Sequence, residues 1–148
     1  WSVRATQRNR AGDHSGAIED ARRALEIDSS YEIPARGALA VARYALGQEE
    51  EAAQELRRAI DGLSDPDHPG STDAYFIAMA LLGTGREDEA IDLLEKVPPG
   101  AWLWFYLQEP NFDRVRDRPR FMAVERAADP REAAPGDGAS PLSPPRSP

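Results

Sequence analysis

The side chains best suited to acid–base chemistry are the two histidines, His14 and His68. A serine or threonine nucleophile needs an activating base within hydrogen-bond reach. His14 opens a predicted surface helix beside a turn, and His68 lies in a loop bounded by two prolines. Neither setting predicts a nucleophile beside the imidazole. We therefore expect both histidines to be solvated, and we predict no catalytic residues and no enzymatic activity.

The carboxylates near His68 are the candidates for a metal site. Asp65, Asp67 and Asp73 offer oxygen ligands, but their spacing differs from that of a twelve-residue calcium loop, and the glycine of that loop is missing. The segment 83–85, Gly-Thr-Gly, follows a predicted helix instead of a strand, which argues against a phosphate-binding loop. The chain has no cysteine, so thiolate zinc sites and disulfides are excluded. We expect no metal and no cofactor.

The arginines near the C-terminal end are the candidates for anion binding. Between residues 101 and 128 there are five arginines and four acidic residues, a net charge of +1, and the whole chain carries −8. Nucleic-acid binding needs a net basic stripe. We predict instead that these arginines form salt bridges within the fold. The interleaved arginines are Arg114, Arg116, Arg118 and Arg120.

The remaining composition favours a globular protein in the cytoplasm. Hydrophobic residues make up 41% of the chain. No apolar run approaches the ~20 residues of a membrane span, and no signal-like segment opens the chain. We expect a cytoplasmic protein with no membrane partner.

The elements that position these side chains repeat along the chain. Gly12, Gly47 and Gly85 each mark a predicted turn, and they are 35 and 38 residues apart. After each turn, small and apolar residues recur at spacings of three, four and seven, which is the pattern of an amphipathic helix. A second predicted helix precedes each turn. The repeated pattern therefore predicts three helix–turn–helix units.

Several residues mark the expected ends of these helices. Pro34 suits the first turn of a helix. Ser71 or Thr72 is expected to cap the N-terminus of the helix that runs through residue 82. Gly47 and Gly83 are expected to adopt the left-handed conformation that ends a helix.

A helix–turn–helix unit of about 34 residues resembles the tetratricopeptide repeat. Trp1 takes the place of the family's tryptophan, and the family's first small residue of the second helix is matched in each unit by Ala17, Ala52 and Ala90. The resemblance covers residues 1–98. It implies an all-α, right-handed superhelix of antiparallel helix pairs, an α-solenoid, with about three repeats of which the first is truncated.

Residues 99–128 do not fit the repeat and are interpreted as an aromatic-rich C-terminal cap of helices. They hold six of the chain's 11 aromatic residues. We expect a helix over residues 101–107, whose aromatic run is interpreted as buried and as sealing the open end of the repeat stack; a partner site is the alternative.

The segment from Asn111 to Phe121 resembles the closing segment that follows tetratricopeptide arrays in many bacterial signalling proteins, with its pattern of Phe-Asp, then Arg, then Asp-Pro-Arg-Phe, except that Arg118 stands here between the aspartate and Pro119. Such proteins carry a kinase, cyclase or DNA-binding domain upstream. The chain opens at Trp1 inside a predicted helix. We expect it to be the C-terminal region of a larger bacterial signalling protein.

Residues 129–148 form a proline-rich tail. They contain six of the 13 prolines and one large apolar residue, Leu142, so we predict that they stay disordered. Three Ser-Pro dipeptides are candidate kinase sites, and 141–144 is a candidate polyproline ligand.

The family resemblance implies that the first helices of the repeats line a concave groove. That lining is apolar, aromatic and methionine-containing with a polar end, which suits an extended peptide or an amphipathic helix. One variety of the family grips acidic C-termini with lysine, arginine and asparagine at fixed places, and the resemblance puts Ser2, Thr6, Ala38, Thr72 and Phe76 at those places here. We expect the Tyr75→Ala change to weaken partner binding by ~1–3 kcal/mol without unfolding the protein. The expected groove residues are Thr6, Asn9, Arg10, Val41, Tyr44, Tyr75, Phe76 and Met79.

The predicted function is therefore protein–protein interaction, as a scaffold or adaptor that binds a protein or peptide partner. Two alternatives stay open. In the first, the repeats pair two copies in a homodimer; in the second, the segment regulates an upstream kinase, cyclase or transcription regulator.

Overall fold

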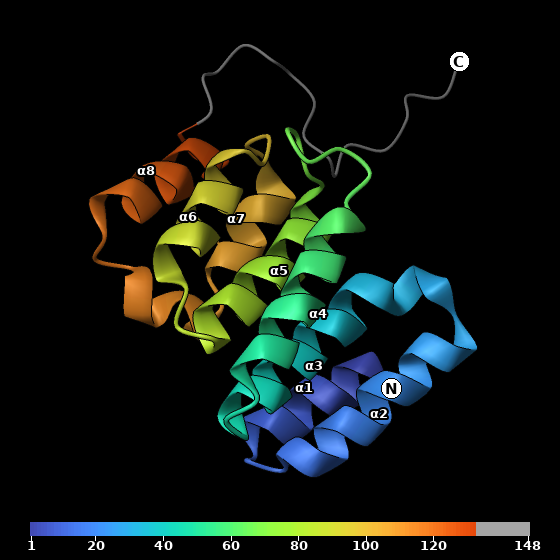
Figure 1. Ribbon diagram of the computed structural model, residues 1–148. Coiled ribbons are helices and arrows are strands. Elements are labelled where there is room, and N and C mark those ends of the chain that lie inside the picture. The colour runs from blue at the N-terminus through green and yellow to red at the C-terminus, as the bar shows by residue number, and fades with distance from the viewer. Residues whose placement is uncertain (133–148) are drawn as a thin grey trace, which may run out of the picture.

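The computed structural model describes residues 1–132, and every regular element in that range is a helix (Figure 1). The predicted all-α class is therefore confirmed for these residues. The predictions made for the tail from residue 133 onward lie outside the described residues. In chain order the elements are α1 (Ser2–Arg10), α2 (His14–Ile27), the 3-10 helix η1 (Ser29–Tyr31), α3 (Glu32–Ala45), α4 (Glu49–Asp61), α5 (Ser71–Gly83), α6 (Glu87–Glu95), α7 (Ala101–Leu107), the 3-10 helix η2 (Pro110–Val115) and α8 (Pro119–Ala128).

The first six α-helices form three pairs, α1–α2, α3–α4 and α5–α6, and one turn geometry joins the helices of each pair. Gly12, Gly47 and Gly85 have φ angles of +81°, +79° and +75°. In each turn the glycine N–H donates to the carbonyl three residues earlier at 3.0–3.1 Å, and the next N–H donates to the carbonyl five residues earlier at 2.8–2.9 Å. This pair of bonds satisfies the last carbonyls of the first helix and requires a left-handed residue. The sequence repeat is thus also a backbone repeat.

Two of the predicted helix ends are wrong. Gly83 is the last residue of α5, and the left-handed turn falls two residues later at Gly85. The cap of α5 is the backbone of Gly70, without a side-chain cap, because the helix already begins at Ser71. The hydroxyl of Thr72 instead lies 3.1 Å from the hydroxyl of Tyr106 on α7.

Helix α3 lies at the centre of the fold. It packs against α1, α2, α4 and α5, with the first pair and the C-terminal helices at opposite ends of the molecule (Figure 1). Close packing is possible because most of its buried residues are small. At Gly37, an added Cβ would lie 3.3 Å from the Cβ of Ala80 on α5. The missing side chain therefore allows α3 and α5 to approach closely.

The C-terminal helices complete the larger of two apolar cores. Phe112 in η2 and Phe121 in α8 are both 0% exposed, and their rings stack at 5.7 Å between centroids. Helix α7 occupies residues 101–107, as predicted, and packs on α5 and α8. These helices therefore form one body with the third helix pair.

The predicted burial of the aromatic run in α7 is wrong for two residues. Trp102 is 69% exposed and Phe105 is 56% exposed. Leu103 and Leu107 take the inward positions instead. Successive residues of an α-helix point about 100° apart, so consecutive aromatic residues cannot all share one buried face.

The helices of residues 1–132 are shorter than a membrane span. The longest, α2 and α3, have 14 residues each, whereas a span needs ~20. Among the described residues, none is long and apolar enough to cross a bilayer.

Candidate functional site

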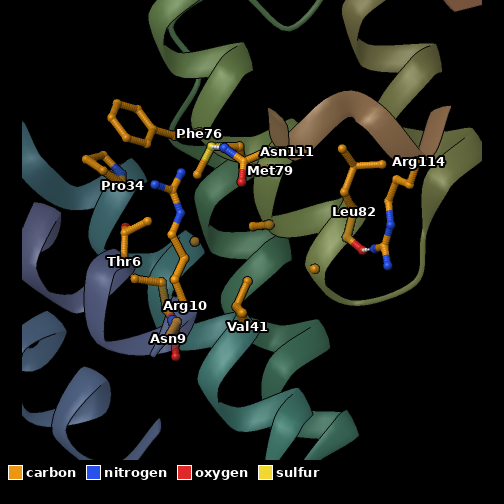
Figure 2. Close-up of a pocket in the computed structure, with 14 residues that line it drawn as sticks. Thr6, Asn9, Arg10, Pro34, Val41, Phe76, Met79, Leu82, Asn111 and Arg114 are labelled. Carbon is orange, nitrogen blue, oxygen red and sulfur yellow. Dashed lines mark hydrogen bonds between the residues drawn. The ribbon is translucent and has the colours of Figure 1, made fainter. Parts of the chain in front are cut away.

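An open cavity of about 260 Å³ lies where α1, α3, α5 and η2 meet (Figure 2). We call it the α1–α3–α5 cavity. Each of the three α-helices contributes residues at helical spacings of three and four, so one stripe of every helix faces the cavity. The lining residues are Thr6, Asn9, Arg10, Pro34, Gly37, Ala38, Val41, Phe76, Met79, Ala80, Leu82, Gly83, Asn111 and Arg114.

The repeat itself accounts for this common stripe. Thr6, Val41 and Met79 each stand six residues before the turn glycine of their helix pair, and all three line the cavity. Because the three turns share one geometry, equivalent positions present equivalent faces. The cavity is therefore built from the first helix of every pair.

The structure brings six of the eight predicted groove residues to this cavity. Tyr44 and Tyr75 are not among its lining residues. Tyr44 is 40% exposed at the end of α3, and its hydroxyl oxygen lies near the α5–α6 turn, 3.5 Å from the position of a Cβ added to Gly85. The six that line the cavity are Thr6, Asn9, Arg10, Val41, Phe76 and Met79.

Tyr75 belongs to the core instead. It is 8% exposed, its ring stacks on that of Tyr106 at 4.5 Å between centroids, and Phe112 lies 6.1 Å away. This burial raises the pKa of the Tyr75 hydroxyl. The Tyr75→Ala change would remove core packing, so it is a poor probe of binding. Phe76, one position further along α5, faces the cavity.

Most polar side chains of the cavity are already hydrogen-bonded within the fold. Asn9 donates from Nδ2 to the carbonyl of Ala38 at 2.8 Å and so ties α1 to α3. Thr6 donates to a carbonyl of its own helix at 3.2 Å. Asn111 Nδ2 contacts the Sδ atom of Met79 at 3.3 Å. A thioether is a weak acceptor, so the Asn111 amide keeps capacity for a stronger partner.

The charged residues of the cavity are both arginines, one on each side. Arg114 donates to the carbonyl of Leu82, and its Nε lies 3.8 Å from a carboxylate oxygen of Glu87. Arg10 is exposed and extends from α1 toward Met79 and Asn111 (Figure 2). Within residues 1–132, Arg10 forms no ion pair, and no aspartate or glutamate lines the cavity.

Sequence reasoning missed eight of the lining residues. Pro34, Gly37 and Ala38 lie seven, four and three residues before Val41, so helical spacing could have found them. Asn111 and Arg114 carried no such signal, because they come from η2, outside the repeat.

The other candidate sites of the sequence serve the fold. The Asp65 carboxylate accepts backbone N–H bonds from Asp67 at 3.0 Å and His68 at 3.1 Å, which shapes the loop and lowers the pKa of Asp65. The ring of His14 lies 3.2 Å from Asn9 Oδ1. In the part of the chain that the structure describes, no three potential metal ligands come together.

The interleaved arginines of residues 114–120 form ion pairs, as predicted. Arg118 contacts Glu87 at 2.8 Å and Asp88 at 2.7 Å. Arg120 contacts Glu95 at 2.7 Å. Most of these partners lie on α6, so the pairs attach η2 and α8 to the third helix pair.

The chain was also compared with known proteins. No protein-family model, no curated protein and no solved structure matches it.

Proposed function

We propose that the chain is a protein-interaction module whose three helix pairs are tetratricopeptide-like repeats, and that the α1–α3–α5 cavity binds a peptide segment of a protein partner. The segment presents an apolar side chain next to a carboxylate. The observation that carries this proposal is the presence, at one cavity, of apolar walls and of Arg10, which has no carboxylate partner among residues 1–132.

The walls of the cavity support an apolar anchor. Val41, Phe76 and Met79 line it and are only partly buried, so they can be covered further by a ligand. Methionine adapts to different shapes. The volume of about 260 Å³ is below the roughly 300–1,000 Å³ of pockets that enclose a drug-sized ligand. One or two side chains of a peptide fit such a space better than a large cofactor.

The charge of the lining supports an acidic neighbour to that anchor. The chain has a net charge of −8, yet the cavity is lined by Arg10 and Arg114 and by no carboxylate of the described residues. An arginine without a partner can bind a carboxylate with two parallel hydrogen bonds. The acidic surface elsewhere repels most acidic peptides, so the cavity would select those whose apolar side chain also fits.

The surroundings of the two histidines favour binding over catalysis. The ring of His14 contacts the amide of Asn9, and the ring of His68 contacts Asp65 in a loop, at 3.4 Å. Neither histidine lines the cavity. The proposed role is therefore that of a scaffold, not of an enzyme.

A second candidate function, self-association, is favoured by exposed apolar residues at the α1–α2 end of the fold. Light scattering at increasing protein concentration tests it, and a monomer at all concentrations would exclude it. These residues are Trp1 (45% exposed), Val3 (63%), Ile27 (60%) and Tyr31 (52%).

The main proposal is tested by selecting random phage-displayed peptides on the immobilised protein. We expect selected peptides to carry aspartate or glutamate beside a large apolar residue. Fluorescence anisotropy of the labelled peptides then gives the dissociation constant. Arg10→Glu should weaken binding about ten- to a hundredfold, equivalent to ~1.4 to ~2.8 kcal/mol.

Arg22→Glu is the matched control. Arg22 is exposed on α2 and makes no ion pair within residues 1–132, and it does not line the cavity. Selected peptides that bind Arg10→Glu as tightly as the wild type, or that are rich in lysine and arginine, would overturn the proposal.

A further inference from the structure

The outer face of α7 carries a group of aromatic side chains that the proposed function does not use. Trp102 and Phe105 are exposed, and their rings meet edge to face at 6.3 Å between centroids. Tyr106 lies 5.8 Å from Phe105 and 6.4 Å from Trp102. Trp104 is partly buried and, two residues from Trp102, points to the other side of the helix. We call Trp102, Phe105 and Tyr106 the aromatic ridge.

The ridge has the composition of a surface that binds another segment. Large aromatic side chains each bury 150–250 Å² when packed, so two that stay exposed on one helix turn leave considerable apolar area uncovered. The ridge also differs from the α1–α3–α5 cavity, because none of its residues lines that cavity. It is therefore a separate surface.

The described chain ends against α7, the helix that carries the ridge. The guanidinium of Arg131 lies 5.5 Å from the centre of the Trp104 ring on that helix. Arg131 also forms an ion pair with Asp129 at 2.7 Å. Residues 133–148 therefore start beside α7.

The composition of residues 133–148 matches the ridge. They contain five prolines, one leucine and no aromatic residue. Proline-rich segments in the polyproline II conformation bind aromatic-lined surfaces, because the extended helix needs little further ordering. At about 3.1 Å per residue, the nine residues that follow Glu132, up to Pro141, reach about 28 Å, well beyond the roughly 10 Å length of a seven-residue helix.

We propose that the proline-rich segment 139–148 of this chain docks on the aromatic ridge of the same molecule. The tether gives the segment an effective concentration in the millimolar range, so even a weak contact is occupied. The ridge would then be covered by the chain itself, and a competing proline-rich partner would have to displace this segment.

The test uses the full chain and the indole N–H signals of its three tryptophans in a nitrogen–proton NMR spectrum, assigned by single Trp→Phe changes. The test variant changes Pro141, Pro144 and Pro145 to serine. We expect the Trp102 signal to shift in this variant and the Trp1 signal, far from the ridge, to stay. Adding a synthetic peptide of residues 133–148 to the variant should move the Trp102 signal back.

The reciprocal variant is Trp102→Ala with Phe105→Ala, two exposed positions whose change spares the core; far-UV circular dichroism checks the fold. We expect the Leu142 methyl signals to move to the values of the free peptide. A Trp102 signal that is the same with and without the prolines would overturn the proposal. A shift that disappears on dilution would overturn it too, because it would place the segment on a second copy.

Discussion

The two apolar cores of the molecule are built from different side chains. The core beneath α1 and α2 is made of five alanines and one leucine, with Ile18 and Leu25 packed at its edge. The larger core, which extends from α3 to α8, contains phenylalanine, leucine, isoleucine and tyrosine beside its alanines. The first relies on close approach of backbones, and the second relies on the burial of large apolar area.

The first two helix pairs also differ from the third pair in buried charge. Asp20 on α2 and Glu55 on α4 are buried, at 4% and 5% exposure. Asp20 pairs with Arg4 and Arg8 on α1, and Glu55 pairs with Arg36 on α3 at 2.9 Å. Each acid stands eight residues after its turn glycine, and the equivalent residue of the third pair is Leu93. Paired charge thus joins the two helices within each N-terminal pair, whereas the third pair has an apolar residue at this position.

The cavity takes lining residues from both cores. Ala38 belongs to the first core, and Ala80 and Leu82 belong to the second. Helix α3, which packs against both α1 and α5, connects the two sides.

The largest expected effect is in the apolar C-terminal core. Phe112→Ala removes a side chain that is 0% exposed and should lower the free energy of unfolding by about 3–5 kcal/mol, from lost burial and the cavity left behind. Urea denaturation followed by circular dichroism measures it. Phe105→Ala, at an exposed position of α7, is the control and should cost less than ~1 kcal/mol. Equal effects would contradict the assignment of the core.

A smaller effect is expected from the buried charge of the first helix pair. Asp20→Ala leaves Arg4 without its carboxylate, while Arg8 keeps its pair with Asp13, and should cost about 1–3 kcal/mol of stability. Both arginines stay partly exposed and can be hydrated, so the cost stays below that of Phe112→Ala. The control is Glu89→Ala, which removes a surface pair with Arg86 and should cost at most ~1 kcal/mol. Asp20→Ala as mild as its control would mean that the buried pair stabilises little.

The repeated turn should respond alike in both regions. Gly47→Ala places a Cβ at a φ of +79° and should cost about 1–2 kcal/mol, although nothing lies within 4 Å of that Cβ. Gly47→Asn should cost less, because asparagine tolerates the left-handed conformation. The same two changes at Gly12 provide the comparison. Thermal unfolding measures all four, and an alanine as stable as the asparagine would contradict the shared turn geometry.

The finest test is the acid sensitivity of the N-terminal region. The hydrogen bond from Arg4 lowers the pKa of Asp20 in the folded protein. The ion pair therefore stabilises the fold fully at pH values above the unfolded-state pKa of Asp20, which is near 4. This stabilisation is lost as the pH falls through the folded-state pKa. Between about pH 5 and about pH 3 the wild type should therefore lose more stability than Asp20→Asn. Urea midpoints against pH measure this. Parallel curves for the two proteins would contradict the role of the pair.

The sequence predicted much of this structure where the information is local and repeated. The glycine turns and the helix of residues 101–107 follow from residue type and spacing. Six groove residues followed from their place in the first helices. Tyr75 and Phe76 show what local sequence does not predict. They are neighbours on one helix, and the position of α7 decides that Tyr75 is the one buried, against Tyr106.

The same limit applies at the C-terminal end. The spacing of Trp102 to Tyr106 predicts a helix, but the packing of η2 and α8 decides which of these rings stays exposed. Asn111 and Arg114 reach the cavity from η2. The position of η2 depends on the packing of Phe112 against Tyr75, which is distant in the sequence. Such contacts are set by tertiary packing and leave no periodic signal.

The most direct test of the proposed peptide site is a methyl NMR titration with the tightest phage-selected peptide. The chain has two methionines: Met79 lines the cavity, and Met122 is 44% exposed on α8. With methyl-labelled methionine, the peptide should shift the Met79 signal to saturation and leave Met122 unchanged, and Arg10→Glu should require a higher peptide concentration for the same shift. Binding that leaves Met79 unmoved would contradict the assignment of the cavity as the binding site.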